Sequence, residues 1–256
     1  MDILLTNDDG IDAEGLGALR DALTEIGDVT VVAPADDKSA VGRAMSHEVD
    51  VVDHEDGFAV RGTPTDCVIA ALGALDCDPD LVVAGCNRGA NLGEYVLGRS
   101  GTVSAAVEAA FYGVPAMAVS LYVPVGKDVT FEDVRPEFGE YAEACRAARY
   151  LAEQAPGAGV FDDADYLNVN APVPDESPTA MRVTRPSHIY EMDAVRDGDT
   201  VHIEDRVWTQ MAEGDISDPE GTDRRAIVEG DISVSPLTAP HTTHHHEALD
   251  DLAAAF

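Results

Sequence analysis

Short runs of apolar residues recur along the first half of the chain, and polar residues, proline or glycine follow each run. The runs are Ile3–Leu5, Val29–Ala33, Leu81–Ala84 and Ala116–Ser120. Short, nearly continuous apolar runs of this kind are typical of strands that are buried on both faces of a parallel sheet. The pattern therefore predicts parallel strands at these positions.

In the segments between these runs, the apolar residues have the spacing of helices. In the first such segment, apolar residues recur at intervals of three or four: Leu16, Leu19, Leu23 and Ile26. Further helices are predicted at 64–75, 100–111 and about 136–154, and an antiparallel hairpin at 49–60. Strands that alternate with helices favour a right-handed, doubly wound arrangement. We therefore expect a Rossmann-like α/β fold with a mostly parallel sheet.

Polar side chains follow the first three predicted strands where each strand ends. Asp8 and Asp9 come directly after the first strand, Ser39 lies in the loop after the second, and Asn87 follows the third. The carboxyl ends of such strands meet at one edge, where ligands bind in open α/β sheets. Adjacent carboxylates favour Mg²⁺ or Mn²⁺, and Asn87 offers a further oxygen ligand or a donor to phosphate. The alternatives are a solvated Asp-Asp-Gly turn and an ordinary loop hydroxyl at Ser39.

A glycine-rich loop at residues 85–93 and the start of the helix at Ser100 suggest an anion site. The loop carries glycines four residues apart and includes Asn91, but it matches neither the dinucleotide fingerprint nor the phosphate loop of P-loop proteins. Ser100, Gly101 and Thr102 open a helix, and the free N–H groups of a helix N-terminus bind phosphate. Ordinary helix capping explains the same residues equally well.

The charge of the chain excludes some classes of function. Its 49 acidic and 16 basic residues give a formal net charge of −33, which repels nucleic acid and anionic membranes. We therefore expect no nucleic-acid partner and no membrane partner. Because salt screens such self-repulsion, the charge also leads to the hypothesis that the protein works in a cytosol of very high salt.

The cysteines and the N-terminus point to the cytoplasm. The cysteines (Cys67, Cys77, Cys86 and Cys145) show no CxxC pairing, so free thiols in a reducing compartment are expected. The N-terminus lacks the basic and apolar regions of a signal peptide, and no apolar run approaches the ~18 residues that span a bilayer. We expect a soluble cytoplasmic protein.

Several of these motifs resemble, in the same order, those of the SurE survival-protein family of nucleotidases. The motifs in the first half are Thr6–Ile11, Ala33–Pro34 with the Ser39 loop, Gly62–Cys67, Gly85–Gly93 and Ser100–Val103. Those in the second half are Leu167–Pro172, Thr184–Arg185 and Gly221–Asp223, which leads to Ser233–Leu237. The resemblance covers nearly the whole chain.

The resemblance implies a metal-dependent phosphatase that acts on nucleoside 5′-monophosphates, often on 3′-monophosphates, and sometimes on short polyphosphate. It places one divalent cation per subunit on Asp8, Asp9, Ser39 and Asn87, of which Asp8, Asp9 and Asn87 are the expected catalytic residues. The expected phosphate-binding residues are Asn91, Ser100, Gly101 and Thr102. Whether Asp8 acts as ligand, base or nucleophile stays open. The segment 94–99 is longer than the usual family spacer, which leaves the base preference open.

The rest of the chain is expected to serve assembly. We expect a catalytic domain at residues 1–186, and a protruding hairpin arm with an oligomerisation segment at residues 187–256. Val201–Ile203 and Arg206–Trp208 look like strands of such an arm. In the family, the arm and a swapped C-terminal segment build dimers and sometimes tetramers, so a homodimer or tetramer is implied.

Histidines near the C-terminus and two basic residues before the arm are less informative. His241, His244, His245 and His246 form a tract that binds transition metals adventitiously in other chains. Because adjacent histidines cannot all face one cation, we expect no metal site there. Arg185 and His188 are predicted to border the active site.

Other functions remain open at this stage. A different metal hydrolase on the same sheet, such as a sugar deacetylase, commonly pairs acids with a histidine, and none precedes Asp8. An aspartyl-phosphate phosphatase needs its acids one residue apart. A non-catalytic nucleotide-binding regulator needs the glycine-rich loop and the helix N-terminus, but not the pair Asp8–Asp9.

Overall fold

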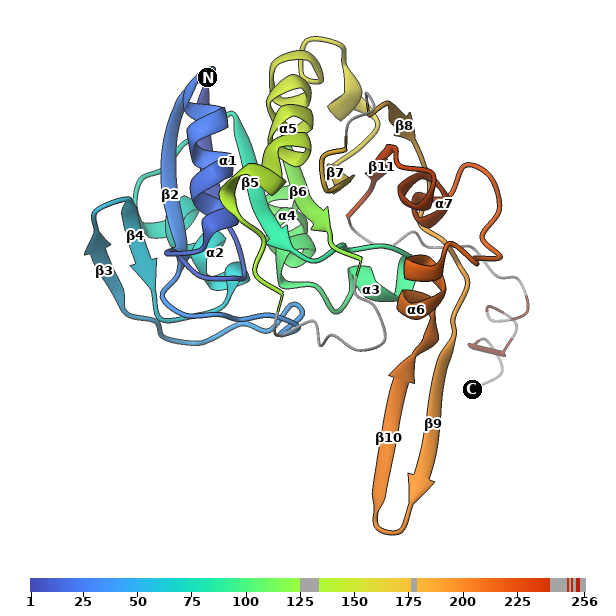
Figure 1. The fold of residues 1–256 in the computed structure, drawn as a ribbon. Helices are drawn as coiled ribbons and strands as arrows, with labels where there is room; N and C mark the ends of the chain where they lie inside the picture. The colour runs from blue at the N-terminus through green and yellow to red at the C-terminus, as the bar shows by residue number, and fades with distance from the viewer. Residues whose placement is uncertain (125–133, 176–178, 240–247, 249, 251, 254–256) are drawn as a thin grey trace.

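The fold is built on one nine-stranded sheet with helices on both faces, and a long hairpin projects from it (Figure 1). The structure is a computed structural model and describes residues 1–124, 134–175, 179–239, 248, 250, 252 and 253. The strands are β1 (Asp2–Thr6), β2 (Asp28–Pro34), β3 (Val51–His54), β4 (Gly57–Val60), β5 (Leu81–Arg88), β6 (Ala116–Tyr122), β7 (Tyr166–Pro172), β8 (Met181–Val183), β9 (Met192–Asp197), β10 (Thr200–Asp205) and β11 (Ile232–Leu237). The helices are α1 (Glu14–Thr24), α2 (Pro64–Ala74), α3 (Glu94–Leu97), α4 (Gly101–Phe111), α5 (Ala142–Gln154), α6 (Arg206–Glu213) and α7 (Asp223–Val228), with 3₁₀ turns η2 (Phe138–Tyr141) and η3 (Val160–Asp162).

The sheet confirms the predicted doubly wound α/β fold. Its strand order is β3-β4-β2-β1-β5-β6-β7-β11-β8, and the strands from β4 to β7 are parallel. The chain runs from β1 to β2 on one side and then returns to β5 on the other side of β1. A change of winding direction between neighbouring parallel strands opens a crevice at their carboxyl ends. In this sheet the crevice lies beyond β1 and β5.

Each face of the sheet carries its own hydrophobic cluster, because side chains alternate along a strand. Ile3 and Leu5 pack with α1 and α5, whereas Leu4 packs with α2 and α4. Figure 1 shows α1 and α5 together on the near face. The apolar run at residues 3–5 is therefore unbroken because both faces of β1 are covered.

The start of α2 follows its sequence signals. The hydroxyl of Thr63 accepts a hydrogen bond from the backbone of Asp66, and the carboxylate of Asp66 accepts one from the backbone of Thr63. This reciprocal capping box satisfies free N–H groups at the helix start. It accounts for Thr63 and Asp66 through structure alone.

The projecting arm consists of β9 and β10, which pair antiparallel. The predicted strand at Val201–Ile203 lies in β10, but the predicted strand at Arg206–Trp208 is wrong, because these residues begin α6. Asp205 caps this helix by accepting a hydrogen bond from Val207, and Val207 and Met211 are buried on its inner face. The cap and this spacing of one turn outweigh the strand propensity of valine and tryptophan.

After the arm the chain returns to the main sheet, where β11 lies between β7 and β8. Residues on both sides of position 186 thus contribute to one sheet, and the division into 1–186 and 187–256 stays a prediction. The histidine tract at residues 241–246 and most of the segment expected to swap lie outside the described residues. Within the described residues, no helix has the length and apolar character needed to cross a membrane.

Candidate active site

A tight turn at the end of β1 places two carboxylates at the crevice. The side chain of Asn7 is buried; its Nδ2 donates a hydrogen bond of 2.7 Å to Gly10 O, and Gly10 N donates one of 3.3 Å to Asn7 Oδ1. Gly10 has a φ of 103°, a backbone conformation that glycine adopts without strain. The amide of Asn7 therefore closes the turn that holds Asp8 and Asp9.

Asp8 lies against the start of α4. Its side chain is buried, and Oδ1 accepts a hydrogen bond of 2.6 Å from the hydroxyl of Thr102. A Cβ atom added to Gly101 would lie 2.8 Å from Cβ of Asp8, so only glycine permits this close approach. Burial raises the pKa of Asp8 to about 6, although the hydrogen bonds from Thr102 counteract part of this effect.

Asp9 lies beside the end of β5. Its Oδ2 accepts a hydrogen bond of 2.8 Å from the backbone N–H of Arg88. Burial and then the charge of Asp8 raise the pKa of Asp9 to about 7. Two neighbouring carboxylates that resist ionisation in this way are stabilised when a bound cation lies between them. The donor chemistry therefore fits a hard divalent cation.

The loop that carries Ser39 and the end of β5, which carries Asn87, meet the same turn. Lys38 N donates a hydrogen bond of 2.7 Å to Asp8 O, so the residue before Ser39 contacts the backbone of Asp8. The exposed hydroxyl of Ser39 donates to Asp37 Oδ1 at 2.6 Å. The Nδ2 atom of Asn87 donates to Gly89 O at 2.6 Å, so its side-chain oxygen is the atom available to a cation. Three strand ends thus converge, as the sequence predicted.

Ser100 fixes the start of α4. Its hydroxyl accepts a hydrogen bond of 3.1 Å from Val103 N, and its carbonyl accepts one of 2.6 Å from the hydroxyl of Ser104. Ser100 therefore caps the helix whose next residues, Gly101 and Thr102, contact Asp8. The acid pair Asp8–Asp9 and the N-terminus of α4 therefore lie side by side.

Comparison with known proteins places the chain in a family. The profile of the family described as "Survival protein SurE" matches residues 3–192, which is most of the chain. The chain belongs to the SurE family. A protein named 5′-nucleotidase SurE from Natronomonas pharaonis is 68% identical, with 100% of each chain covered. One with the same name from Haloarcula marismortui is 65% identical, over 99% of this chain and 94% of that protein.

A solved structure agrees with this assignment. The crystal structure of the Sure protein from Aquifex aeolicus has a TM-score of 0.78 and 29% sequence identity to the chain. The match covers 100% of this chain and 99% of that chain. The SurE fold therefore extends over the arm as well as the main sheet.

Asn91 takes part in a buried polar network with residues of strands β6 and β7 of the SurE sheet. Its Nδ2 donates to Ser120 Oγ at 2.9 Å, and its backbone N–H donates to Asn170 Oδ1 at 2.8 Å. Its carbonyl accepts from the side chains of Asn168 and Asn170. Sequence reasoning assigned no role to Ser120, Asn168 or Asn170. The signal was available, because asparagines two residues apart place polar groups on one face of the buried strand β7.

Arg185 and His188 contact residues other than the acid pair. Arg185 donates to the carbonyls of Glu220 and Gly221, and exposed His188 forms an ion pair of 2.7 Å with Glu94. Their predicted place at the border of the site stays a prediction. Sequence reasoning did not single out the buried residue Arg224, which contacts Leu92, shortly before Ser100.

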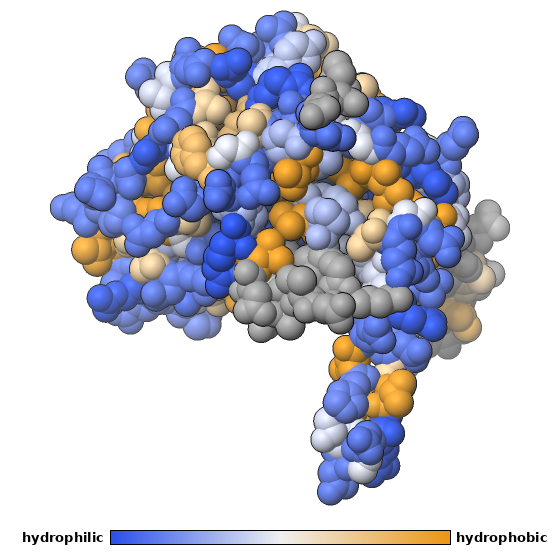
Figure 2. All heavy atoms as spheres, in the orientation of Figure 1, coloured by the Kyte–Doolittle hydropathy of each residue, from blue (hydrophilic) through white to orange (hydrophobic). Residues whose placement is uncertain are grey.

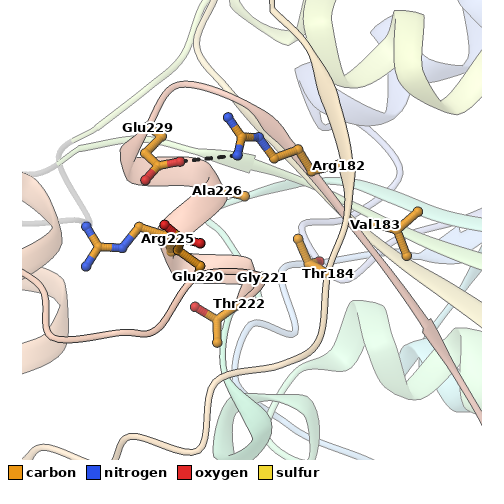
Figure 3. A pocket seen from close by; sticks show the side chains of 9 residues that line it. All are labelled: Arg182, Val183, Thr184, Glu220, Gly221, Thr222, Arg225, Ala226 and Glu229. Carbon is orange, nitrogen blue, oxygen red and sulfur yellow. Dashed lines mark ion pairs between the residues drawn. The ribbon is translucent and has the colours of Figure 1, made fainter.

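A cavity of about 240 Å³ lies between β8 and α7 of this SurE fold (Figure 3). Its lining residues are Arg182, Val183, Thr184, Glu220, Gly221, Thr222, Arg225, Ala226 and Glu229. The guanidinium of Arg182 forms an ion pair with Glu229, and that of Arg225 donates to backbone carbonyls of Ile216 and Asp218. Because these cations already have partners, the cavity is a weaker ligand site than the acid pair.

Proposed function

We propose that the chain is a metal-dependent 5′-nucleotidase, a phosphomonoesterase that hydrolyses nucleoside monophosphates to nucleoside and phosphate. Relatives that are 68%, 65% and 59% identical to the chain carry the name 5′-nucleotidase SurE. The observation that carries the proposal is the hydrogen bond between Thr102 and Asp8. It joins the carboxylates suited to a cation to the helix start suited to a phosphate.

In this proposal Asp8, Asp9, Ser39 and Asn87 hold one Mg²⁺ or Mn²⁺ ion, with Asp8, Asp9 and Asn87 nearest the chemistry. The bound cation supplies charge that polarises a phosphoryl oxygen and lowers the pKa of a water molecule. The side chains orient this centre: Asp9 is fixed by Arg88 N, and Asp8 by Thr102. A rigid donor set reduces the reorganisation that the reaction requires.

The phosphate of the substrate is proposed to lie at Ser100, Gly101 and Thr102, at the N-terminus of α4. Asn91 is proposed to bind the phosphate with them, and its bond to Ser120 fixes its side chain. Activity on 3′-monophosphates and short polyphosphate is proposed as an extension, because the site recognises the phosphoryl group by its charge. The base and sugar preferences depend on the residues beside Ser100.

A non-catalytic nucleotide-binding regulator is the second function that the sequence left open. The burial of Asp8 next to Asp9 disfavours it. Two carboxylates beside a bound phosphate repel that phosphate unless a cation lies between them. A protein that only binds nucleotide gains nothing from this repulsion, whereas a metal-dependent hydrolase requires the acids.

Phosphate release tests the proposal. The assay uses 5′- and 3′-nucleoside monophosphates, short polyphosphate and sugar phosphates in molar KCl, each with Mn²⁺, Mg²⁺ or EDTA. We expect release that depends on the cation and that EDTA abolishes. The Asp8→Asn variant, purified in the same way, controls for contaminating phosphatases and should lose at least about 100-fold in rate. Nucleotide binding without release under either cation would contradict the proposal.

The arm is proposed to join two copies of the chain into a homodimer or a tetramer. Ile203 pairs with Ala194 and Val201 pairs with Arg196, so these residues share one face of the hairpin. Val201 and Ile203 are 53% and 71% exposed, and Figure 2 shows hydrophobic surface on the arm. A second copy covers this face in the proposal. A cytoplasmic location is proposed with it, supported by the free cysteines.

A further inference from the structure

The segment that precedes Ser100–Thr102 is held in place by contacts with other elements of the fold. It runs from Gly93 to Arg99 and contains the one-turn helix α3, none of whose residues is buried. A helix of one turn is not stable by itself, and within this one Leu97 is partly buried against the core cluster that includes α2 and α4. Its contacts with other elements therefore determine where Ser100–Thr102 lies.

The buried side chains of Asp223 and Arg224 hold the beginning of the segment. Asp223 is fully buried; its Oδ2 accepts from Gly93 N at 2.7 Å and its Oδ1 accepts from Ser187 N at 3.0 Å. Arg224 is also fully buried and donates to the carbonyls of Leu92 and Ile189. These two residues of α7 thus connect the segment to Ser187 and Ile189, which precede the first strand of the arm.

Tyr95 holds the middle of the segment at the base of the arm. Its hydroxyl donates a hydrogen bond of 2.5 Å to Oδ2 of Asp205, the residue that ends β10 and caps α6. The guanidinium groups of Arg99 and Arg224 each lie 5.2 Å from the centre of the Tyr95 ring. Figure 1 shows α3 beside α6 where the arm leaves the body.

The end of the segment touches both halves of the proposed site. Arg99 O accepts a hydrogen bond of 3.1 Å from Gly42 N, in the loop that also carries Ser39. The next residue, Ser100, caps α4, and Thr102 then contacts Asp8. A displacement of the segment therefore shifts the phosphate motif relative to Asp8.

We propose that Tyr95 is a positioning residue for phosphate: its hydrogen bond to Asp205 sets the place of Ser100–Thr102 relative to Asp8 and thereby ties the site to the base of the arm. This inference rests on the proposed nucleotidase function. Tyr95 does not touch the reacting atoms. Its loss should weaken binding of the phosphoryl group and leave the cation ligands intact.

The test compares Tyr95→Phe with the unaltered protein and with Tyr190→Phe. Phenylalanine keeps the ring but removes the hydroxyl that binds Asp205. Tyr190 is a matched control, because its ring lies 5.1 Å from that of Tyr95 and is exposed. Five quantities are measured: kcat and KM for a nucleoside 5′-monophosphate, the Kd of inorganic phosphate in Mn²⁺, the Kd of Mn²⁺, and Tm.

Tyr95→Phe should raise KM and the Kd of inorganic phosphate by about threefold to tenfold, the effect expected for one lost hydrogen bond. Its kcat should stay within about twofold, and its Mn²⁺ affinity and Tm should stay near those of the unaltered protein. Asp205→Asn keeps both an acceptor and a helix cap, so it should behave like the unaltered protein.

Other results would overturn the inference. Unchanged KM and phosphate affinity in Tyr95→Phe would show that the hydroxyl does not position the site. A parallel loss of Tm, Mn²⁺ affinity and phosphate affinity would assign Tyr95 a structural role only. If the unaltered protein binds inorganic phosphate without releasing it from nucleotides, the proposed function fails and the phosphate Kd alone decides the inference. If it neither releases nor binds phosphate, both fail.

Discussion

Thr102 donates a hydrogen bond of 2.6 Å to Asp8 across 94 residues of sequence. The sequence assigned these residues to different tasks, Asp8 to a cation and Thr102 to phosphate. The contact makes each depend on the other, because the hydroxyl favours the charged form of the carboxylate. A change at Thr102 should therefore affect the cation as well as the phosphate.

Thr102→Val should weaken Mn²⁺ binding. The variant removes a hydrogen bond to a charged group, worth about 1.5–3 kcal/mol, and raises the pKa of Asp8 further. The loss of Mn²⁺ affinity should be larger at pH 6 than at pH 8, since protons then compete better. Calorimetric titration at both pH values measures it, with Thr102→Ser as the control that keeps the hydroxyl. Equal Mn²⁺ affinity in all proteins would contradict the expected coupling.

The metal-free protein should lose stability as the pH rises. Asp9 has a pKa of about 7 in the folded protein, above its ordinary value of 3.8, so the folded state binds more protons between these values. Stability from this group is therefore present at pH 4 and is lost as the pH rises through 7. In EDTA, the Tm of the unaltered protein should fall between pH 4 and pH 7 more steeply than the Tm of Asp9→Asn.

Mn²⁺ provides the matching control for this pH effect. It should raise the Tm of the unaltered protein at pH 8 and have little effect on Asp9→Asn, which has lost a carboxylate. If the Tm of the two proteins in EDTA depends equally on pH, Asp9 is not the group responsible.

Gly93→Ala should destabilise the protein strongly. An added Cβ would lie 2.1 Å from Nη2 of buried Arg224, and the φ of 86° is unfavourable for alanine. A loss of about 2–4 kcal/mol is expected, because both a clash and backbone strain are introduced. Urea unfolding measures it. Gly98→Ala is the control: a Cβ there meets nothing within 4 Å, so its unfolding should be nearly unchanged.

Salt should stabilise the fold. The net charge of −33 repels itself, and the screening length falls from about 8 Å at 0.15 M to about 3 Å at 1 M salt. Tm should therefore rise with KCl through the molar range. The rise should be smaller near pH 4, where many carboxylates are protonated. A Tm that is independent of KCl would contradict the high-salt hypothesis.

Ile203→Asp should disrupt the proposed assembly. The substitution places a charge on the apolar face of the arm, where a second copy is expected to pack. Light scattering after gel filtration should show a shift towards the monomer. His202→Asp adds a charge on the opposite face of the same strand and should keep the assembly. A monomeric unaltered protein would refute the proposal directly.

Local patterns predicted the sheet and the position of Asp8 and Asp9 at its edge, because both features depend on residues near one another in sequence. The run at residues 3–5 encodes burial on both faces, and Gly10 encodes the turn that follows it. Ser100 was found for the same reason, since a cap acts on its own helix. These elements needed no knowledge of distant partners.

The missed features depend on pairings between distant segments. Asp223 contacts Gly93 across 130 residues, and Tyr95 contacts Asp205 across 110 residues. No spacing rule connects such positions, so neither pair was visible in the sequence. The strand predicted at 206–208 failed because burial against the body, together with the Asp205 cap, selected a helix. Tertiary context overrode propensity there.

The insertion of β11 between β7 and β8 has a consequence for synthesis on the ribosome. β8 leaves the ribosome well before its partner, because the whole arm, α6 and α7 are made in between. During that interval β7 has an open edge, the kind of edge that recruits strands from other nascent chains. Asn168 and Asn170 of β7 place polar groups beside that edge until β11, the strand that pairs with it, has been made.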